Sequence, residues 1–157
     1  MKPYANTNFL TRLYLGLEGV SVAQTWLNDA VAQNSPPLPL TWLGELEMLN
    51  AVERCVFVTR TEGRLRVSPE FAAAVRAEFR DALILGDFLR PAALSYATLR
   101  GHFESLVVRH TAKHGFRTYD VLHVASALLL GCDTFWSFDL QARKLAELEG
   151  LHVPALI

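Results

Sequence analysis

The most informative stretch of the sequence is Arg117–Ala146, RTYDVLHVASALLLGCDTFWSFDLQARKLA. Its pattern predicts a helix, a turn, a strand at 134–138 and a second helix. Apolar residues cover a wide arc of the first helix, which indicates that this helix is largely buried. Thr118 is the expected N-cap, and Gly131 is the expected residue just beyond the helix end. A strand between two helices is typical of an α/β domain.

Two carboxylates lie at the two ends of this unit. Asp120 falls in the first turn of the first helix, and Asp139 falls where the strand ends and the next helix begins. His123 follows Asp120 by three residues and shares its helix face. Ligand sites of open α/β sheets lie at the carboxyl ends of strands. An Asp in a first turn also complements the helix dipole, and an Asp at such a junction is an ordinary N-cap. Both interpretations stay open at this point.

Length and composition predict a single globular domain over 1–157, because 51% of the residues are hydrophobic and 20% are charged. The net charge of −1 argues against a protein that coats nucleic acid by bulk charge, but it is compatible with a nuclease that has an acidic site and a basic rim. Cys55 and Cys132 lack a metal-binding spacing and predict buried thiols in a reducing compartment. The N-terminus lacks a secretory signal, and the most apolar run is too short for a bilayer. We therefore expect a cytoplasmic protein with no membrane partner.

The rest of the chain predicts strands alternating with helices. Further strands are expected at 2–5, 38–41 and 151–157. Helices are expected at 9–14, 22–33, 43–57, 69–85 and 96–114, with a basic, turn-rich link at 59–66. The last three helices have Thr41, Ser68 and Ser95 as their expected N-caps. This order implies an α/β fold with a central parallel sheet of about four or five strands flanked by helices.

Polar residues recur where strands end and helices begin. They are Asn6, Glu47, Asp120 and Asp139, with Glu45 as the nearby competitor for Glu47. Hard divalent cations prefer oxygen ligands, partly carboxylate and partly water. Nucleases use such clusters to activate water and to stabilise an in-line displacement at phosphorus. The signal is the common placement of these residues, because their spacing in sequence carries no metal signature.

Four motifs together resemble the PIN domain, the ribonuclease fold of the VapC-type toxins in toxin–antitoxin pairs. They are YANTN at 4–8, EMLNA at 47–51, YDVLHVA at 119–125, and FWSFD at 135–139 with Gln141, Leu145 and Ala146 following. The resemblance covers essentially the whole chain. The last two motifs are fairly specific as a pair, whereas the second is weak by itself.

The resemblance implies a metal-dependent endoribonuclease in which Glu47, Asp120 and Asp139 bind Mg²⁺ or Mn²⁺. Its implied partners are an RNA substrate and an antitoxin protein, and a homodimer is left open. Residues near the acidic positions are carried over as supporting residues: Thr7, Ser137, His123 and Arg117. His123 is expected to be a packed, hydrogen-bonded residue beside the site rather than a metal ligand.

The first motif departs from the family, which normally has Asp where this chain has Asn6. An amide offers one neutral oxygen, so Asn6 can replace the fourth carboxylate only with a weaker hold on the metal. Three explanations for Asn6 stay open: an introduced inactivating change, natural degeneration of the site, or a site that tolerates Asn. The alternative function is therefore a catalytically inactive PIN-like protein that keeps RNA or antitoxin binding. A phosphatase or phosphoacceptor fold would need Asp at the end of the first strand.

Overall fold

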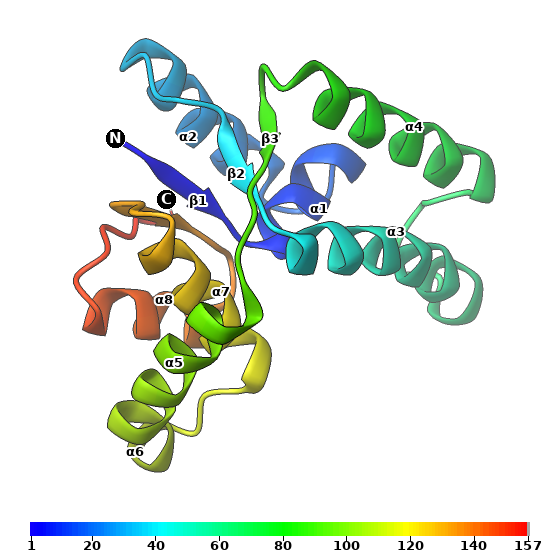
Figure 1. The fold of residues 1–157 in the computed structure, drawn as a ribbon. Helices are drawn as coiled ribbons and strands as arrows, with labels where there is room; N and C mark the ends of the chain where they lie inside the picture. The colour runs from blue at the N-terminus through cyan, green and yellow to red at the C-terminus, as the bar shows by residue number, and fades with distance from the viewer. Residues whose placement is uncertain (157) are drawn as a thin grey trace.

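Short parallel strands form the centre of the molecule in the computed structural model, which describes residues 1–156 (Figure 1). The strands are β1 (Pro3–Ala5), β2 (Leu38–Leu40), β3 (Leu89–Pro91) and β4 (Thr134–Trp136). β1 pairs with β4 and β2 pairs with β3, both in parallel, and β1 lies beside β2. The expected α/β class with a parallel centre is therefore confirmed, although the strands are short.

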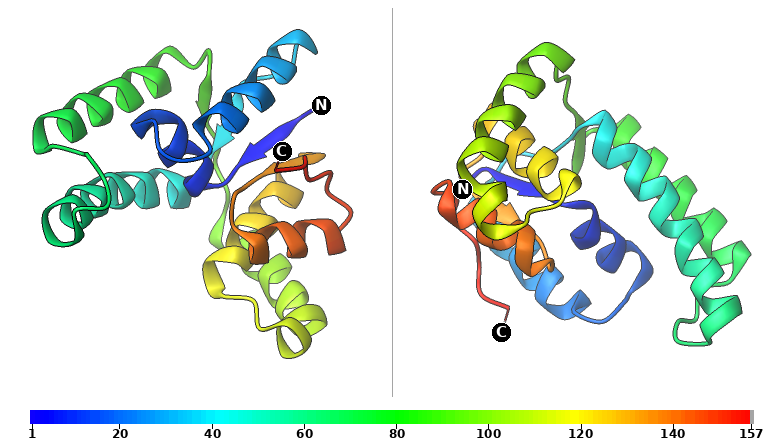
Figure 2. Two further views of the ribbon diagram at one scale, coloured as in Figure 1. Left: turned by 180° about the vertical axis from the view of Figure 1, so that it is seen from behind. Right: turned by 90° about the horizontal axis from the view of Figure 1, so that it is seen from below.

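Helices surround these strands on both sides (Figures 1 and 2). Their bounds are α1 Thr7–Leu15, α2 Val20–Ala32, α3 Trp42–Glu62, α4 Pro69–Leu85, α5 Tyr96–Leu106, α6 Ala112–His114, α7 Thr118–Leu129 and α8 Leu140–Leu148. A π-helical turn, Val107–Thr111, joins α5 to α6. α3 packs along α4 on one side of the strands, whereas α7 packs against α5 and α8 on the other.

Alternation along β1 and β4 divides the interior into two hydrophobic cores. Ala5 and Trp136 face a core built with α1 to α4, whereas Tyr4 and Phe135 face a core built with α5, α7 and α8. Successive strand residues point to opposite faces, so two adjacent strands supply side chains to both cores. The Tyr4 and Phe135 rings stack with centroids 5.8 Å apart. This packing fixes the carboxyl ends of β1 and β4 next to each other.

Side-chain caps begin several helices as the sequence predicts. Thr41, Ser68 and Ser95 accept hydrogen bonds from backbone N–H groups at the starts of α3, α4 and α5. Pro69 occupies the first turn of α4, and Gly86 ends that helix in the left-handed region at φ 73°.

Several expected boundaries were wrong. α3 continues to Glu62, through the first half of the expected link at 59–66, and ends where Gly63 supplies the left-handed cap. β3 was not expected, since an exposed edge strand with a terminal proline has a weak sequence signal.

At the C-terminus, only His152 of the expected strand 151–157 forms a bridge, to Thr134, and residue 157 lies outside the described residues. Both cysteines are free; Cys132 is buried as expected, whereas Cys55 is only half-buried. Within residues 1–156, no helix combines the length and the apolar character needed to cross a membrane.

Candidate active site

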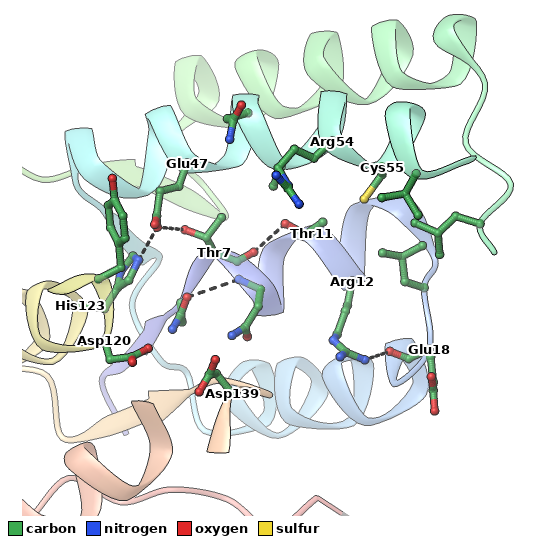
Figure 3. A pocket seen from close by; sticks show the side chains of 18 of the residues that line it. Thr7, Thr11, Arg12, Glu18, Glu47, Arg54, Cys55, Asp120, His123 and Asp139 are labelled. Atoms are coloured by element: carbon green, nitrogen blue, oxygen red, sulfur yellow. Dashed lines mark hydrogen bonds and ion pairs between the residues drawn. The ribbon is translucent and has the colours of Figure 1, made fainter. Parts of the chain in front are cut away.

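A cavity of about 800 Å³ opens where the carboxyl ends of β1 and β4 meet α1, α3 and α7. The sequence-predicted residues that line it are Asn6, Thr7, Glu47, Arg117, Asp120, His123 and Asp139. Figure 3 shows Glu47, Asp120, His123 and Asp139 gathered at one end of this cavity. Glu45 does not line the cavity and is exposed. The structure therefore places Glu47 rather than Glu45 with the other predicted residues.

Asn6 joins the end of β1 to the start of α1. Its backbone N–H donates to the Trp136 carbonyl at 2.9 Å, which continues the pairing with β4. As the N-cap of α1, its side-chain oxygen accepts from the Asn8 N–H at 3.4 Å, and its amide donates to the Ser137 hydroxyl at 3.4 Å. Asn6 is thus held between the ends of β1 and β4, and its exposed fraction is 6%.

Ser137 is fully buried behind the cavity and does not line it. Its hydroxyl oxygen accepts from the Asn8 side-chain amide at 3.1 Å and from the Asp139 backbone N–H at 3.0 Å. The Asn8 side chain also accepts from the Phe138 N–H at 2.9 Å. These contacts join the turn after β1 to the turn after β4. Ser137 therefore supports the site from behind the cavity and does not face a ligand.

Asp120 and Asp139 each fill the ordinary structural role that their positions suggest, and they also face the cavity. Asp139 is the N-cap of α8 and accepts from the backbone N–H groups of Gln141 and Ala142. Asp120 accepts from the Arg117 backbone N–H at 3.1 Å, which makes Arg117 the N-cap of α7. The expected N-cap, Thr118, is instead the first helical residue, because the Asp120 carboxylate accepts the Arg117 backbone N–H and so begins the helix one residue earlier.

One guanidinium group contacts both of these carboxylates. Arg117 Nε lies 3.2 Å from an Asp120 oxygen, and Arg117 Nη2 lies 2.6 Å from an Asp139 oxygen. Hydrogen bonds to these two carboxylates raise the pKa of Arg117, so the group stays charged. Asp120 and Asp139 are therefore near enough to share a single cation.

Glu47 belongs to a chain of hydrogen bonds that runs into the protein. His123 Nε2 contacts Glu47, and the Thr7 hydroxyl donates to the same carboxylate oxygen at 2.7 Å. Behind them, the Tyr4 hydroxyl lies 2.9 Å from His123 Nδ1. Burial raises the pKa of Glu47, but the hydrogen bonds from His123 and Thr7 outweigh it, so this pKa lies below its ordinary value. Glu47 is thus an oriented, ionised acceptor, and His123 is buried and hydrogen-bonded as expected.

The residues at the other end of the cavity were not predicted from the sequence. This end is lined by Arg12, Arg54, Leu17, Val58 and Leu65. The signal was present in α3, where Glu47, Asn50, Ala51, Arg54 and Val58 follow helical spacing along one face. Only the packing of α1 opposite this face makes these residues part of one cavity.

The oxygen atoms at the acidic end suit a hydrated divalent cation. Among residues 1–156, no three His, Cys, Asp or Glu side chains gather closely enough for a site made of these residues alone. Mg²⁺, however, commonly binds through one or two carboxylates and keeps several waters. Asp120 and Asp139 share one cationic group, Arg117, and Asn6 adds an amide oxygen nearby. This donor set fits Mg²⁺ or Mn²⁺ with water in the remaining positions.

No protein-family model matches the sequence, and a comparison with curated proteins finds no match. Among solved structures, the chain is similar to VapC20 of Mycobacterium tuberculosis, a toxin that cleaves the sarcin–ricin loop. The two chains are 18% identical, the similarity covers 91% of this chain and 94% of that one, and the TM-score is 0.56. The chain therefore has the PIN-like α/β fold of this toxin.

Proposed function

We propose that this protein is a metal-dependent endoribonuclease of the VapC toxin type, weakened by Asn6. One observation carries the proposal: within a PIN-like fold, Asn6, Glu47, Asp120 and Asp139 come from four separate segments and line one cavity. A purely structural role for each residue would not require a common cavity.

In this proposal, Asp120, Asp139 and the Asn6 amide oxygen hold Mg²⁺ or Mn²⁺. A bound divalent cation lowers the pKa of water and stabilises the charge that develops at phosphorus. Glu47, kept ionised by His123 and Thr7, orients a water molecule as a hydrogen-bond acceptor. Most of the catalysis is electrostatic, because the site offers fixed charges and dipoles rather than a covalent nucleophile.

The proposed partners are an RNA substrate and an antitoxin protein that covers the cavity; a homodimer remains an option. A second function is favoured by Asn6 itself, because the amide lacks the charge of a carboxylate. In that case the protein is a catalytically inactive PIN-like domain that binds RNA or an antitoxin.

The test is a single-turnover RNA cleavage assay with and without Mn²⁺, on the protein and on Asn6→Asp. We expect Mn²⁺-dependent cleavage that is at least about tenfold faster for Asn6→Asp, which corresponds to about 1.4 kcal/mol. Asp120→Asn and Asp139→Asn in the Asn6→Asp background are the matched inactive controls.

RNA binding without cleavage by either form would favour the inactive binding protein. If neither form binds or cleaves RNA, the ribonuclease function and the RNA-binding function are both overturned.

A further inference from the structure

The cavity extends well beyond the acidic residues along α3. Glu47 and Arg54 are seven residues apart on one helix face, which is about 10 Å along the axis. Figure 3 shows Arg54 and Cys55 farther along α3 than Glu47, away from Asp120 and His123. A ligand that spans both ends of the cavity is therefore longer than one phosphate group.

Arg54 is a cation whose charge is available for a ligand. Within residues 1–156, it forms neither an ion pair nor a side-chain hydrogen bond, whereas Arg76 on the adjacent α4 pairs with Glu53. Arg12 on the opposite wall is already engaged, because its guanidinium donates to the Glu18 carbonyl and lies 4.6 Å from the Phe138 ring centroid. Of these two cavity-lining arginines, Arg54 is therefore the better candidate for binding an anion.

Half-buried apolar groups surround the cavity next to Arg54. They are Leu17, Cys55, Val58 and Leu65. Burial raises the pKa of the Cys55 thiol, so this group is neutral and adds to the apolar surface. Asn50, one turn before Arg54, supplies an amide that can donate and accept hydrogen bonds. A cation, an amide and an apolar wall together match the phosphate, the polar edge and the flat face of an unpaired nucleotide.

We propose that this end of the cavity is a subsite for an unpaired nucleotide that neighbours the cleaved phosphate, with Arg54 on its phosphate and Val58 against its base. This inference rests on the proposed ribonuclease function and names the residues that hold the neighbouring nucleotide. The acidic end needs a cation to accept a phosphate, whereas the Arg54 end does not.

The experiment measures binding of a fluorescently labelled ten-nucleotide single-stranded RNA, in EDTA and again in Mn²⁺, as salt is varied. Arg54→Ala should weaken binding about three- to tenfold and should lower the slope of log K against log salt by about 0.7, the value for one phosphate contact on a single strand. Arg54→Lys should keep the slope. Arg60→Ala is the matched control, because Arg60 is exposed on α3 outside the cavity.

Val58→Asn tests the base contact separately, and it should weaken binding without changing the salt slope. Thermal unfolding of each variant shows whether it is folded. Equal binding by Arg54→Ala and Arg60→Ala would overturn the subsite and assign this end of the cavity to a protein partner. Unchanged affinity of Val58→Asn would overturn the base contact. If the unaltered protein binds RNA in neither buffer, the proposed function fails together with the subsite.

Discussion

Arg117 donates a 2.6 Å hydrogen bond to Asp139, which lies 22 residues later in the chain. The same guanidinium contacts Asp120, so it links the start of α7 to the start of α8 across the acidic end of the cavity. The Arg117 side chain is 67% exposed, whereas that of Asp120 is only 7% exposed. A largely exposed positive charge therefore neutralises two carboxylates at the place where we expect a metal ion.

Replacing Arg117 should tighten metal binding. In Arg117→Met the guanidinium no longer competes for Asp120 and Asp139, and each exposed ion pair that is lost is worth about 0.2–1 kcal/mol. We expect Mn²⁺ affinity to rise about two- to tenfold in a calorimetric titration.

Arg109→Met is the control for this change, because Arg109 pairs with Glu149 away from the cavity. Mn²⁺ affinity that falls in Arg117→Met would mean that Arg117 assists the metal site instead of competing with the cation.

Asn6→Asp should change stability in opposite directions with and without metal. The new carboxylate adds negative charge near Asp120 and Asp139, so without Mn²⁺ we expect the Tm to fall by about 2–4 °C, equivalent to about 1 kcal/mol for a domain of this size. Excess Mn²⁺ should raise the Tm of this variant above that of the unaltered protein, because a ligand that binds only the folded state stabilises it.

Differential scanning calorimetry measures both values for Asn6→Asp. Asn50→Asp is the matched control, since it places a charge in the same cavity but on α3. An equal response to Mn²⁺ in the two variants would show that Asn6 has no special place in the metal site.

His123→Phe should destabilise the protein. The change preserves an aromatic ring of similar shape but leaves the Tyr4 hydroxyl and the Glu47 carboxylate without their shared partner. His123 is 2% exposed, so water cannot easily replace it. We expect a loss of about 2–3 kcal/mol in the free energy of unfolding, measured by urea denaturation.

Glu45→Gln, at an exposed position outside the cavity, should change the free energy of unfolding by less than about 0.5 kcal/mol. A His123→Phe protein as stable as the unaltered one would argue against the hydrogen-bond chain.

Arg143→Met should loosen the C-terminal segment from the site. The buried Arg143 donates to the Ser137 carbonyl at 3.0 Å and to the Pro154 carbonyl at 2.6 Å. Methionine keeps the apolar part of the side chain but donates nothing, so we expect about 2 kcal/mol of lost stability.

Hydrogen exchange should increase at the backbone N–H groups after β4 in Arg143→Met, and Lys144→Met, at the exposed neighbouring position, is its control. Unchanged exchange would mean that Arg143 does not hold this turn.

The sequence by itself determined the features that depend on near neighbours. The caps Thr41, Ser68 and Ser95 bond to groups within three residues of themselves, so their patterns predicted helix starts correctly. The placement of Asp120 and Asp139 at helix starts was predictable for the same reason. The alternation of strands and helices similarly predicted the α/β class, because hydrophobic periodicity is local.

Only the tertiary structure decided which of these residues meet. His123 contacts Glu47 across 76 positions, Arg117 contacts Asp139 across 22, and Arg54 faces α1. Such contacts depend on how the helices pack against the two hydrophobic cores that lie on opposite faces of β1 and β4. The sequence specifies the charge and length of each side chain. The partner of that side chain depends on how distant segments pack, and a local sequence pattern does not contain this information.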